Sequence, residues 1–131
     1  MNTSTPTDFI ASPESNPQWT FLSDEQRIEY IGKYLQHVWQ AEEEAGRIAK
    51  EKEKLGDAVL WEATEGPDRY DLPGEVQESM RCEMLLYYNS MNAHLAIEQA
   101  FHIQYRYWEW EMKKLQMISI HAPRKGSDKK F

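Results

Sequence analysis

The sequence predicts an all-α fold: a long antiparallel two-helix hairpin that dimerises into a four-helix bundle. Residues 75 to 115 contain neither proline nor glycine, and their apolar side chains recur at alternating spacings of four and three, which is the helical period. A second pattern of the same period begins near residue 28. Because two helices bury little by themselves, we expect the hairpin to pair with a copy. We expect an extended arm at residues 1–22, a hairpin domain at 23–118 with helices at about 23–62 and 74–116, and a flexible basic tail at 119–131.

Composition limits the size of the core. The chain has 131 residues, 40% of them apolar, a mean hydropathy of -0.79 and a net charge of -7. Aromatic residues nevertheless make up 12% of it, and disordered chains are poor in aromatics. We therefore expect one folded domain whose aromatic side chains lie in a core or an interface.

The single cysteine, Cys82, excludes an intrachain disulfide and a cysteine zinc site. Residues 1–5 lack the basic and apolar regions of a signal peptide, and no stretch approaches the ~20 apolar residues of a membrane span. These features predict a cytoplasmic protein that does not bind membranes.

Charge is divided unevenly along the chain. Residues 1–112 carry 9 basic and 21 acidic side chains, whereas residues 113–131 carry six basic side chains and one acidic. An acidic body disfavours direct nucleic-acid binding and favours a basic protein partner.

The first helix has a clear start. Three prolines mark residues 1–20 as irregular, and we expect residues 19–22, which include Trp19, to pack over the beginning of the helix. Phe9 and Ile10 have no assigned role. Ser23 and Gln26 predict a reciprocal capping box.

An apolar seam follows along the first helix, interrupted at Lys52. Its members are Ile28, Ile31, Leu35, Val38, Ala41, Ala45, Ile48, Leu55 and Val59. Gly46 lies among alanines, so we expect the other helix to approach closely there. Glu43, Arg47 and Glu51 are spaced to form ion pairs on the exposed side.

The second helix carries a longer stripe. It consists of Met80, Met84, Tyr87, Met91, His94, Glu98, Phe101, Tyr105, Trp108, Met112 and Leu115. Residues 101–107 also alternate as a strand would, but no turn signal separates them from the helical pattern and Trp108 breaks the alternation. We favour a helix there, while residues 115–120 fit either structure.

Two polar residues, His94 and Glu98, interrupt this stripe, and His102 follows one turn later. If the hairpin turns about residue 67, His37 lies opposite, which completes a polar core cluster of His94, Glu98, His102 and His37. The favoured interpretation is a hydrogen-bonded His–Glu pair that fixes the helix register. Metal binding and acid–base chemistry are alternatives, but the spacing of Glu98 and His102 differs from the Glu-x-x-His motif of di-iron bundles. We predict no metal, no cofactor and no catalytic residue.

The aromatic residues near the end of the second helix surround it. A helix that is apolar on more than one side buries a second surface, against the arm, a copy of the chain or a foreign protein. The loop between the helices, with Trp61 and Tyr70 nearby, either folds back or binds a partner. The candidate partner-binding residues are Tyr105, Tyr107, Trp108, Trp110, Trp61 and Tyr70.

These features predict a non-enzymatic protein-binding module. By analogy of class, it resembles small acidic inhibitors or adaptors of the phage or mobile-element type, which engage a basic or nucleic-acid-binding protein. The alternative is a metal-binding helical bundle that uses the histidine and glutamate cluster.

Overall fold

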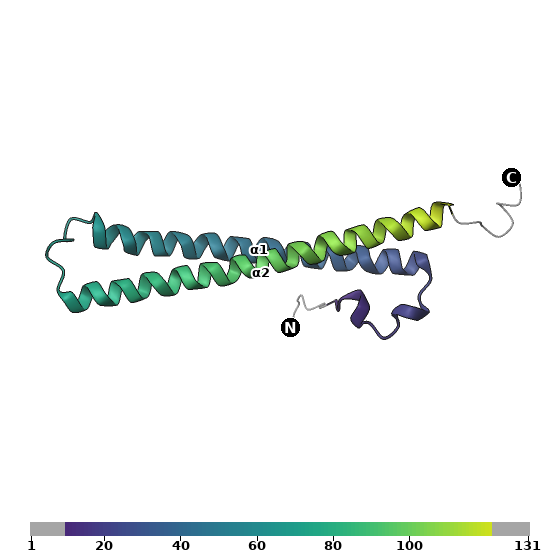
Figure 1. Cartoon of the computed structure of the whole chain (residues 1–131), viewed down its shortest axis with the longest axis horizontal. Helices are drawn as coiled ribbons and strands as arrows, with labels where there is room; N and C mark the ends of the chain where they lie inside the picture. Colours follow the sequence, from purple (N-terminus) through teal and green to yellow (C-terminus); the bar gives the residue numbers. More distant parts are fainter. Residues whose placement is uncertain (1–9, 122–131) are drawn as a thin grey trace, which may run out of the picture. The chain divides into compact units, whose positions relative to one another are not determined.

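The computed structural model describes residues 10–121, with side chains to residue 118, and it contains two long helices. Helix α1 (Asp24–Thr64) has 41 residues and α2 (Gly74–His121) has 48, and residues 65–73 join them (Figure 1). Two short 3₁₀ helices precede them, η2 (Pro13–Ser15) and η3 (Trp19–Phe21). None of residues 10–121 forms a strand. The predicted all-α hairpin is therefore confirmed, and the segment that fitted both a helix and a strand, residues 101–120, is helical.

The chain divides into two compact units. Unit 1 comprises Met1–Gln40 with His102–Phe131, and unit 2 is Ala41–Phe101. Each unit contains one stretch of each helix. The predictions for Phe9 and for most of the basic tail fall on residues 1–9 and 122–131, which lie outside the described residues.

The predicted capping box starts α1. The backbone N–H of Ser23 donates to Gln26 Oε1 at 2.9 Å, and the N–H of Gln26 donates to Ser23 Oγ at 3.2 Å. Each side chain thus satisfies a backbone donor that the first helical turn leaves open. Asp24 and Glu25 place negative charge at the same end, where the helix dipole favours it.

The N-terminal arm, residues 10–22, packs onto α1 in unit 1. Arg27 Nε donates to the carbonyl of Trp19 at 3.2 Å, and its guanidinium lies 5.3 Å from the centre of the Trp19 ring. The hydroxyl of Tyr30 donates to the carbonyl of Ala11 at 2.7 Å. Packing of residues 19–22 over the helix start is therefore confirmed. The arm, expected to be extended or disordered, includes the two short 3₁₀ helices η2 and η3.

Most of the buried side chains belong to unit 1. Ile31 and Val38 of α1 are 0% and 1% exposed, and Leu35 and Tyr34 are also buried. The hydroxyl of Tyr34 donates to Gln104 Oε1 of α2 at 3.1 Å. A continuous apolar core in this unit thus holds the two helix segments together.

Unit 2 has a thinner core, which small residues of α1 allow. Ala45 and Ala49 are buried. A Cβ at Gly56 would lie 2.7 Å from Cε1 of Tyr88, and a Cβ at Gly46 would lie 2.5 Å from Oε2 of Glu98. At Gly46, where a close approach of the other helix was expected, the nearest atoms of α2 belong to the Glu98 carboxylate.

One position of the predicted α1 seam is wrong. Leu55 is 41% exposed, whereas Gly56 is buried and Lys52 is half-buried. The ammonium of Lys52 lies 5.9 Å from the centre of the Tyr87 ring. The seam moves because a straight helix drifts relative to a strict seven-residue repeat, so the facing position changes along α1.

The inner stripe of α2 agrees with the prediction. Every one of its expected members from Met80 to Leu115 is half-buried or buried.

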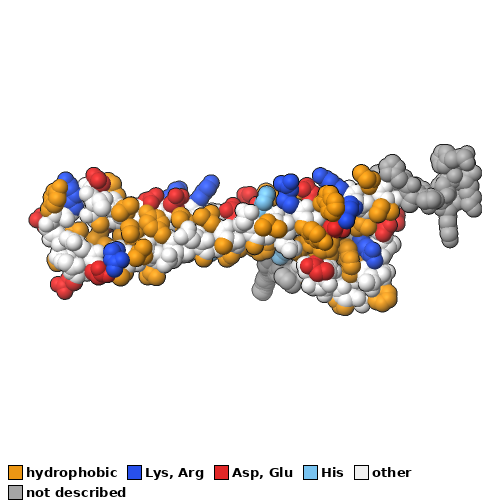
Figure 2. Space-filling view, viewed as in Figure 1, with side chains coloured by type: hydrophobic (Ala, Val, Ile, Leu, Met, Phe, Trp, Pro, Cys, Tyr) orange, Lys and Arg blue, Asp and Glu red, His pale blue; other side chains and the backbone are white. Residues whose placement is uncertain are grey.

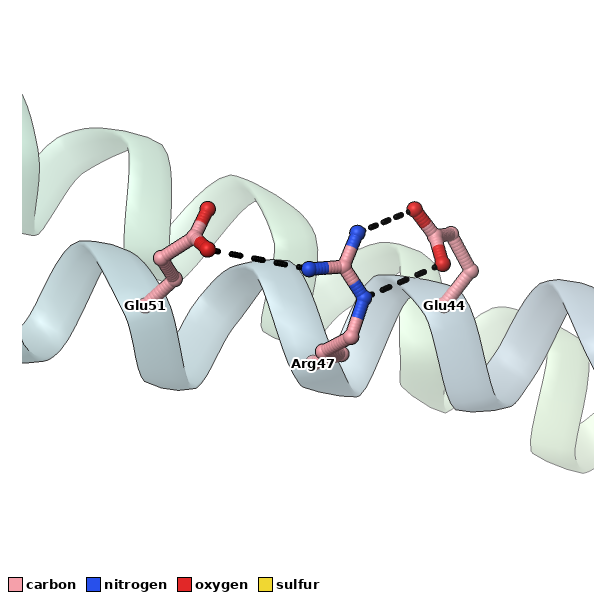
Figure 3. Close-up of polar contacts among 3 residues, drawn as sticks. All are labelled: Glu44, Arg47 and Glu51. Atoms are coloured by element: carbon pink, nitrogen blue, oxygen red, sulfur yellow. Dashed lines mark hydrogen bonds and ion pairs between the residues drawn. The ribbon is translucent and has the colours of Figure 1, made fainter.

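On the exposed side of α1, Arg47 pairs with Glu44 and Glu51, where Glu43 and Glu51 were expected (Figure 3). Such exposed pairs contribute little to stability, so packing along the stripe must hold the hairpin together.

Two glycines of α1 should respond oppositely to alanine. At Gly32, no atom lies within 4 Å of the position that a Cβ would occupy, so Gly32→Ala should stabilise the fold by about 1 kcal/mol through helix propensity. Gly56→Ala should destabilise it, because the new methyl group displaces the Tyr88 ring. Urea denaturation followed by circular dichroism of dilute protein tests both. Equal effects of the two substitutions would contradict the described packing.

The stability of the fold should fall at alkaline pH through Tyr34. Burial raises the pKa of the Tyr34 hydroxyl, and the negative charge of Glu14 adds to the effect. Because the folded pKa lies above the unfolded value of about 10, this contribution is present below pH ~10 and is lost as the pH rises through the folded pKa. Thermal melts between neutral and strongly alkaline pH should show a smaller loss for Tyr34→Phe than for the wild type. A parallel loss in both proteins would refute the assignment.

Candidate protein-binding surface on α2

Helix α2 buries one face in unit 1, centred on Trp108. The Trp108 side chain is 6% exposed, and its ring meets the Trp19 ring edge to face at 6.0 Å. Trp19 also meets the Tyr30 ring at 5.9 Å. The arm thus joins α1 and α2 in one aromatic cluster. The indole N–H of Trp108 is buried without a hydrogen-bond partner among the described residues, so this cluster retains an unfavourable polar group.

The opposite face of α2 carries an exposed apolar stripe, which we call the outer stripe: Ile103, Tyr107, Trp110 and Met117. These side chains are 57%, 51%, 56% and 62% exposed. Spacings of four, three and seven residues put them on one side of the helix. The Tyr107 ring lies at the border with the buried face, where it meets the Trp108 ring edge to face at 5.0 Å. In unit 1, hydrophobic side chains gather around the end of α2 and the arm, with basic side chains among them (Figure 2).

Cationic groups surround the outer stripe. The ammonium of Lys114 lies 4.1 Å from the centre of the Trp110 ring and 3.1 Å from a carboxylate oxygen of Glu111. Arg106 and Lys113, together with Tyr107, Glu109 and Trp110, line a shallow hollow of about 400 Å³. The surface therefore combines exposed aromatic rings with basic side chains, a composition that is common in protein interfaces.

The six aromatic candidates differ in what they can contact. Tyr107 and Trp110 are exposed side by side on the outer stripe. Trp108 is covered by the arm and α1, so it cannot reach a partner, and Tyr105 is half-buried beside α1. In unit 2, Trp61 is 56% exposed and Tyr70 is 84% exposed, with the Arg69 guanidinium 4.5 Å from the Tyr70 ring.

Sequence reasoning missed three members of this surface. Ile103, Lys114 and Met117 continue the spacing of Tyr107 and Trp110 along the helix. The signal was a second series at alternating spacings of four and three, offset from the inner stripe.

The helix register at Glu98 differs from the one expected for the predicted polar cluster. His94 Nδ1 donates to the carbonyl of Ser90 in its own helix at 2.8 Å, and Glu98 lies against Gly46. The expected register is therefore wrong, since Glu98 faces Gly46 and not positions 36 to 40. The Glu98 carboxylate occupies the space that a Cβ at Gly46 would need. His94 and Glu98 belong to unit 2, whereas the half-buried His37 and the exposed His102 belong to unit 1.

The described part of the chain was searched for metal-ligand groups and for membrane-spanning helices. There, no group of three or more His, Cys, Asp or Glu side chains is arranged to hold a metal ion. Neither α1 nor α2, as far as each is described, is long and apolar enough to cross a membrane.

Comparison with known proteins gives no relative. No family model matches the chain, and no similar curated protein or solved structure was found. The function must therefore be inferred from the surface of α2.

Two tryptophans two residues apart in α2 should differ sharply in their effect on stability. Trp108→Ala should cost about 3–5 kcal/mol, because it removes the centre of the buried cluster. Trp110→Ala should change stability by no more than about 0.5 kcal/mol, because its ring is exposed. Urea denaturation followed by circular dichroism measures both, and a similar cost at the two positions would contradict this division of α2.

Proposed function

We propose that this chain is a non-enzymatic protein-binding module whose contact surface is the outer stripe of α2. The observation that carries the proposal is the exposure of Tyr107 and Trp110 on a helix whose other face is already packed. Isolated exposed apolar residues are ordinary, but a contiguous apolar stripe surrounded by charged groups is typical of an interaction site. Tryptophan, tyrosine and arginine are also the residues that most often dominate binding energy.

The charge of unit 2 supports a basic partner. Residues 41–101 carry 14 acidic and 6 basic side chains. A field of this sign speeds the encounter with a basic protein, including one that itself binds nucleic acid. An inhibitor or adaptor role fits this arrangement. The outer stripe would supply most of the affinity, and the same stripe supports association of two copies of the chain.

The test compares two tryptophans of equal exposure. Trp110 and Trp61 are both 56% exposed, so their replacement by alanine removes similar free surface from different units. The full chain should be used to isolate partners from its native cell, and the affinity of each identified partner should then be measured by calorimetry.

Trp110→Ala should weaken binding by roughly tenfold or more, as expected for an aromatic hot spot, whereas Trp61→Ala should change it little. A partner that binds the wild-type chain, Trp110→Ala and Trp61→Ala with equal affinity would contradict the proposed contact surface. Failure of the wild-type chain to bind any protein, including itself, would contradict the proposed function.

A further inference from the structure

A groove between α1 and α2 in unit 1 is left open. It has a volume of about 340 Å³ and is lined by Gly32, Leu35, Gln36 and Trp39 of α1 and by Tyr105 and Met112 of α2. Trp39 is 50% exposed at its edge. The lining is mainly apolar, so an apolar side chain carried on a helix suits it.

Gly32 lies in this groove, in the interior of α1, without a close neighbour among the described residues. The other two glycines inside α1 are packed, since a Cβ at Gly46 or Gly56 would be less than 3 Å from Glu98 or Tyr88, whereas Gly74, which also meets nothing, is the first residue of α2. At Gly32, nothing lies within 4 Å of that position. Glycine weakens a helix interior, and its absent side chain leaves space for an approaching group. The missing contact at Gly32 therefore points to a group from another molecule.

We propose that this groove receives Trp110 from a second copy of the chain, and that the second copy's groove receives Trp110 of the first. This inference rests on the proposed function, because it assigns the partner of the outer stripe. Unit 1 contains both halves of the contact, an open groove and the exposed side chain of Trp110, whose ring contacts only in part the ammonium of Lys114. A two-fold axis parallel to the helices makes the contact reciprocal, so that a closed dimer forms.

The charges on the two surfaces are complementary. On α1, the side that carries Gly32 continues at spacings of four and three through Glu25, Glu29, Gln36 and Trp39. Both glutamates lie near the N-terminal end of α1, and Glu29 has only an exposed ion pair with Lys33, at 3.8 Å. The basic groups beside Trp110 lie near the C-terminal end of α2. When the two-fold axis of the dimer is parallel to the helices, the C-terminal end of α2 in one copy lies beside the N-terminal end of α1 in the other copy. Lys113 and Lys114 of one copy then approach Glu25 and Glu29 of the other.

The exposed aromatic side chains supply part of the area that a dimer needs. A large aromatic side chain buries roughly 150–250 Å², and about half of this remains exposed at each of Trp39, Tyr107 and Trp110. These three side chains therefore leave roughly 225–375 Å² to be covered on each copy, and Ile103 and Met117 add to it. A standard interface buries about 800 Å² per partner, so this one patch supplies a large part of it.

The decisive test uses substitutions whose effects on folding and on pairing are opposite. Sedimentation equilibrium of the full chain should show a dimer at micromolar concentration. Gly32→Ala should raise the thermal stability of the dilute monomer and yet weaken the dimer. Gly32→Met, which fills the groove, and Trp110→Ala, which removes the inserted ring, should each weaken the dimer by roughly tenfold or more. Trp61→Ala, the matched control in unit 2, should leave it unchanged.

Mixing two defective chains tests reciprocity. Gly32→Met keeps its Trp110 but lacks a groove, whereas Trp110→Ala keeps a groove but lacks the ring. The mixture should therefore recover one of the two contacts and form a heterodimer more tightly than either variant pairs with itself.

Charge reversal tests the proposed ion pairs between the two copies. Replacing Glu25 and Glu29 by lysine should weaken the dimer, and adding Lys113→Glu and Lys114→Glu to the same chain should restore it.

A wild-type chain that remains monomeric at high micromolar concentration would overturn this inference. A dimer that is indifferent to Gly32→Met and Trp110→Ala would do the same. Either result leaves the proposed function standing if a different protein binds the chain and Trp110→Ala weakens that binding. If Trp110→Ala weakens the binding of no partner, the proposed contact surface and the proposed dimer contact are both refuted.

Discussion

A helix with two apolar faces needs two neighbours, and this constraint governs the structure of unit 1. Helix α1 and the N-terminal arm cover the inner face of α2, where Trp108 meets Trp19 and where Ile31 and Val38 are fully buried. Residues 10–121 provide no further element for the opposite face. Among the described residues, more large apolar side chains are exposed than buried. The outer stripe is therefore a consequence of an architecture that provides too few helices for the apolar surface in its sequence.

The two units meet this constraint in different ways. In unit 1, the arm adds a third wall, so large side chains such as Tyr34 and Trp108 can be buried. In unit 2, α1 presents small residues to α2, namely Ala45, Ala49, Gly46 and Gly56. These residues let side chains of α2 come close to the backbone of α1, but they offer little side-chain area for contact between the two helices. Close approach improves packing, but small side chains remove little apolar surface from water. Local opening should therefore require less free energy in unit 2 than in unit 1.

Periodicity and capping chemistry were sufficient to predict most of the fold. Ser23 with Gln26 located the start of α1, and every member of the inner stripe of α2 is buried or half-buried. Tyr88 and Gln104 also contact α1, although the stripe did not include them. Register could not be predicted, because it depends on which residue receives which side chain. The Glu98 carboxylate occupies the notch at Gly46, and no rule of spacing identifies that match in advance.

The binding surface was only partly predictable. Tyr107 and Trp110 were identified because they lie off the inner stripe, yet Trp108 was included with them although the arm covers it. Covering of Trp108 depends on a tertiary contact with Trp19, more than eighty residues away in the sequence. The groove at Gly32 could not be recognised at all, because a glycine without neighbours differs from a packed one only in three dimensions.

The position of Lys114 shows how the chain tolerates an exposed tryptophan. Its ammonium lies over the Trp110 ring, and the same group pairs with Glu111. The cation covers part of the ring's face and keeps charge beside an apolar surface, which opposes indiscriminate association. A partner must therefore offer more than an apolar contact: it must also replace the interactions of Lys114. A surface that supplies both a cavity for the ring and a carboxylate for the ammonium satisfies this requirement, whereas a purely apolar surface does not.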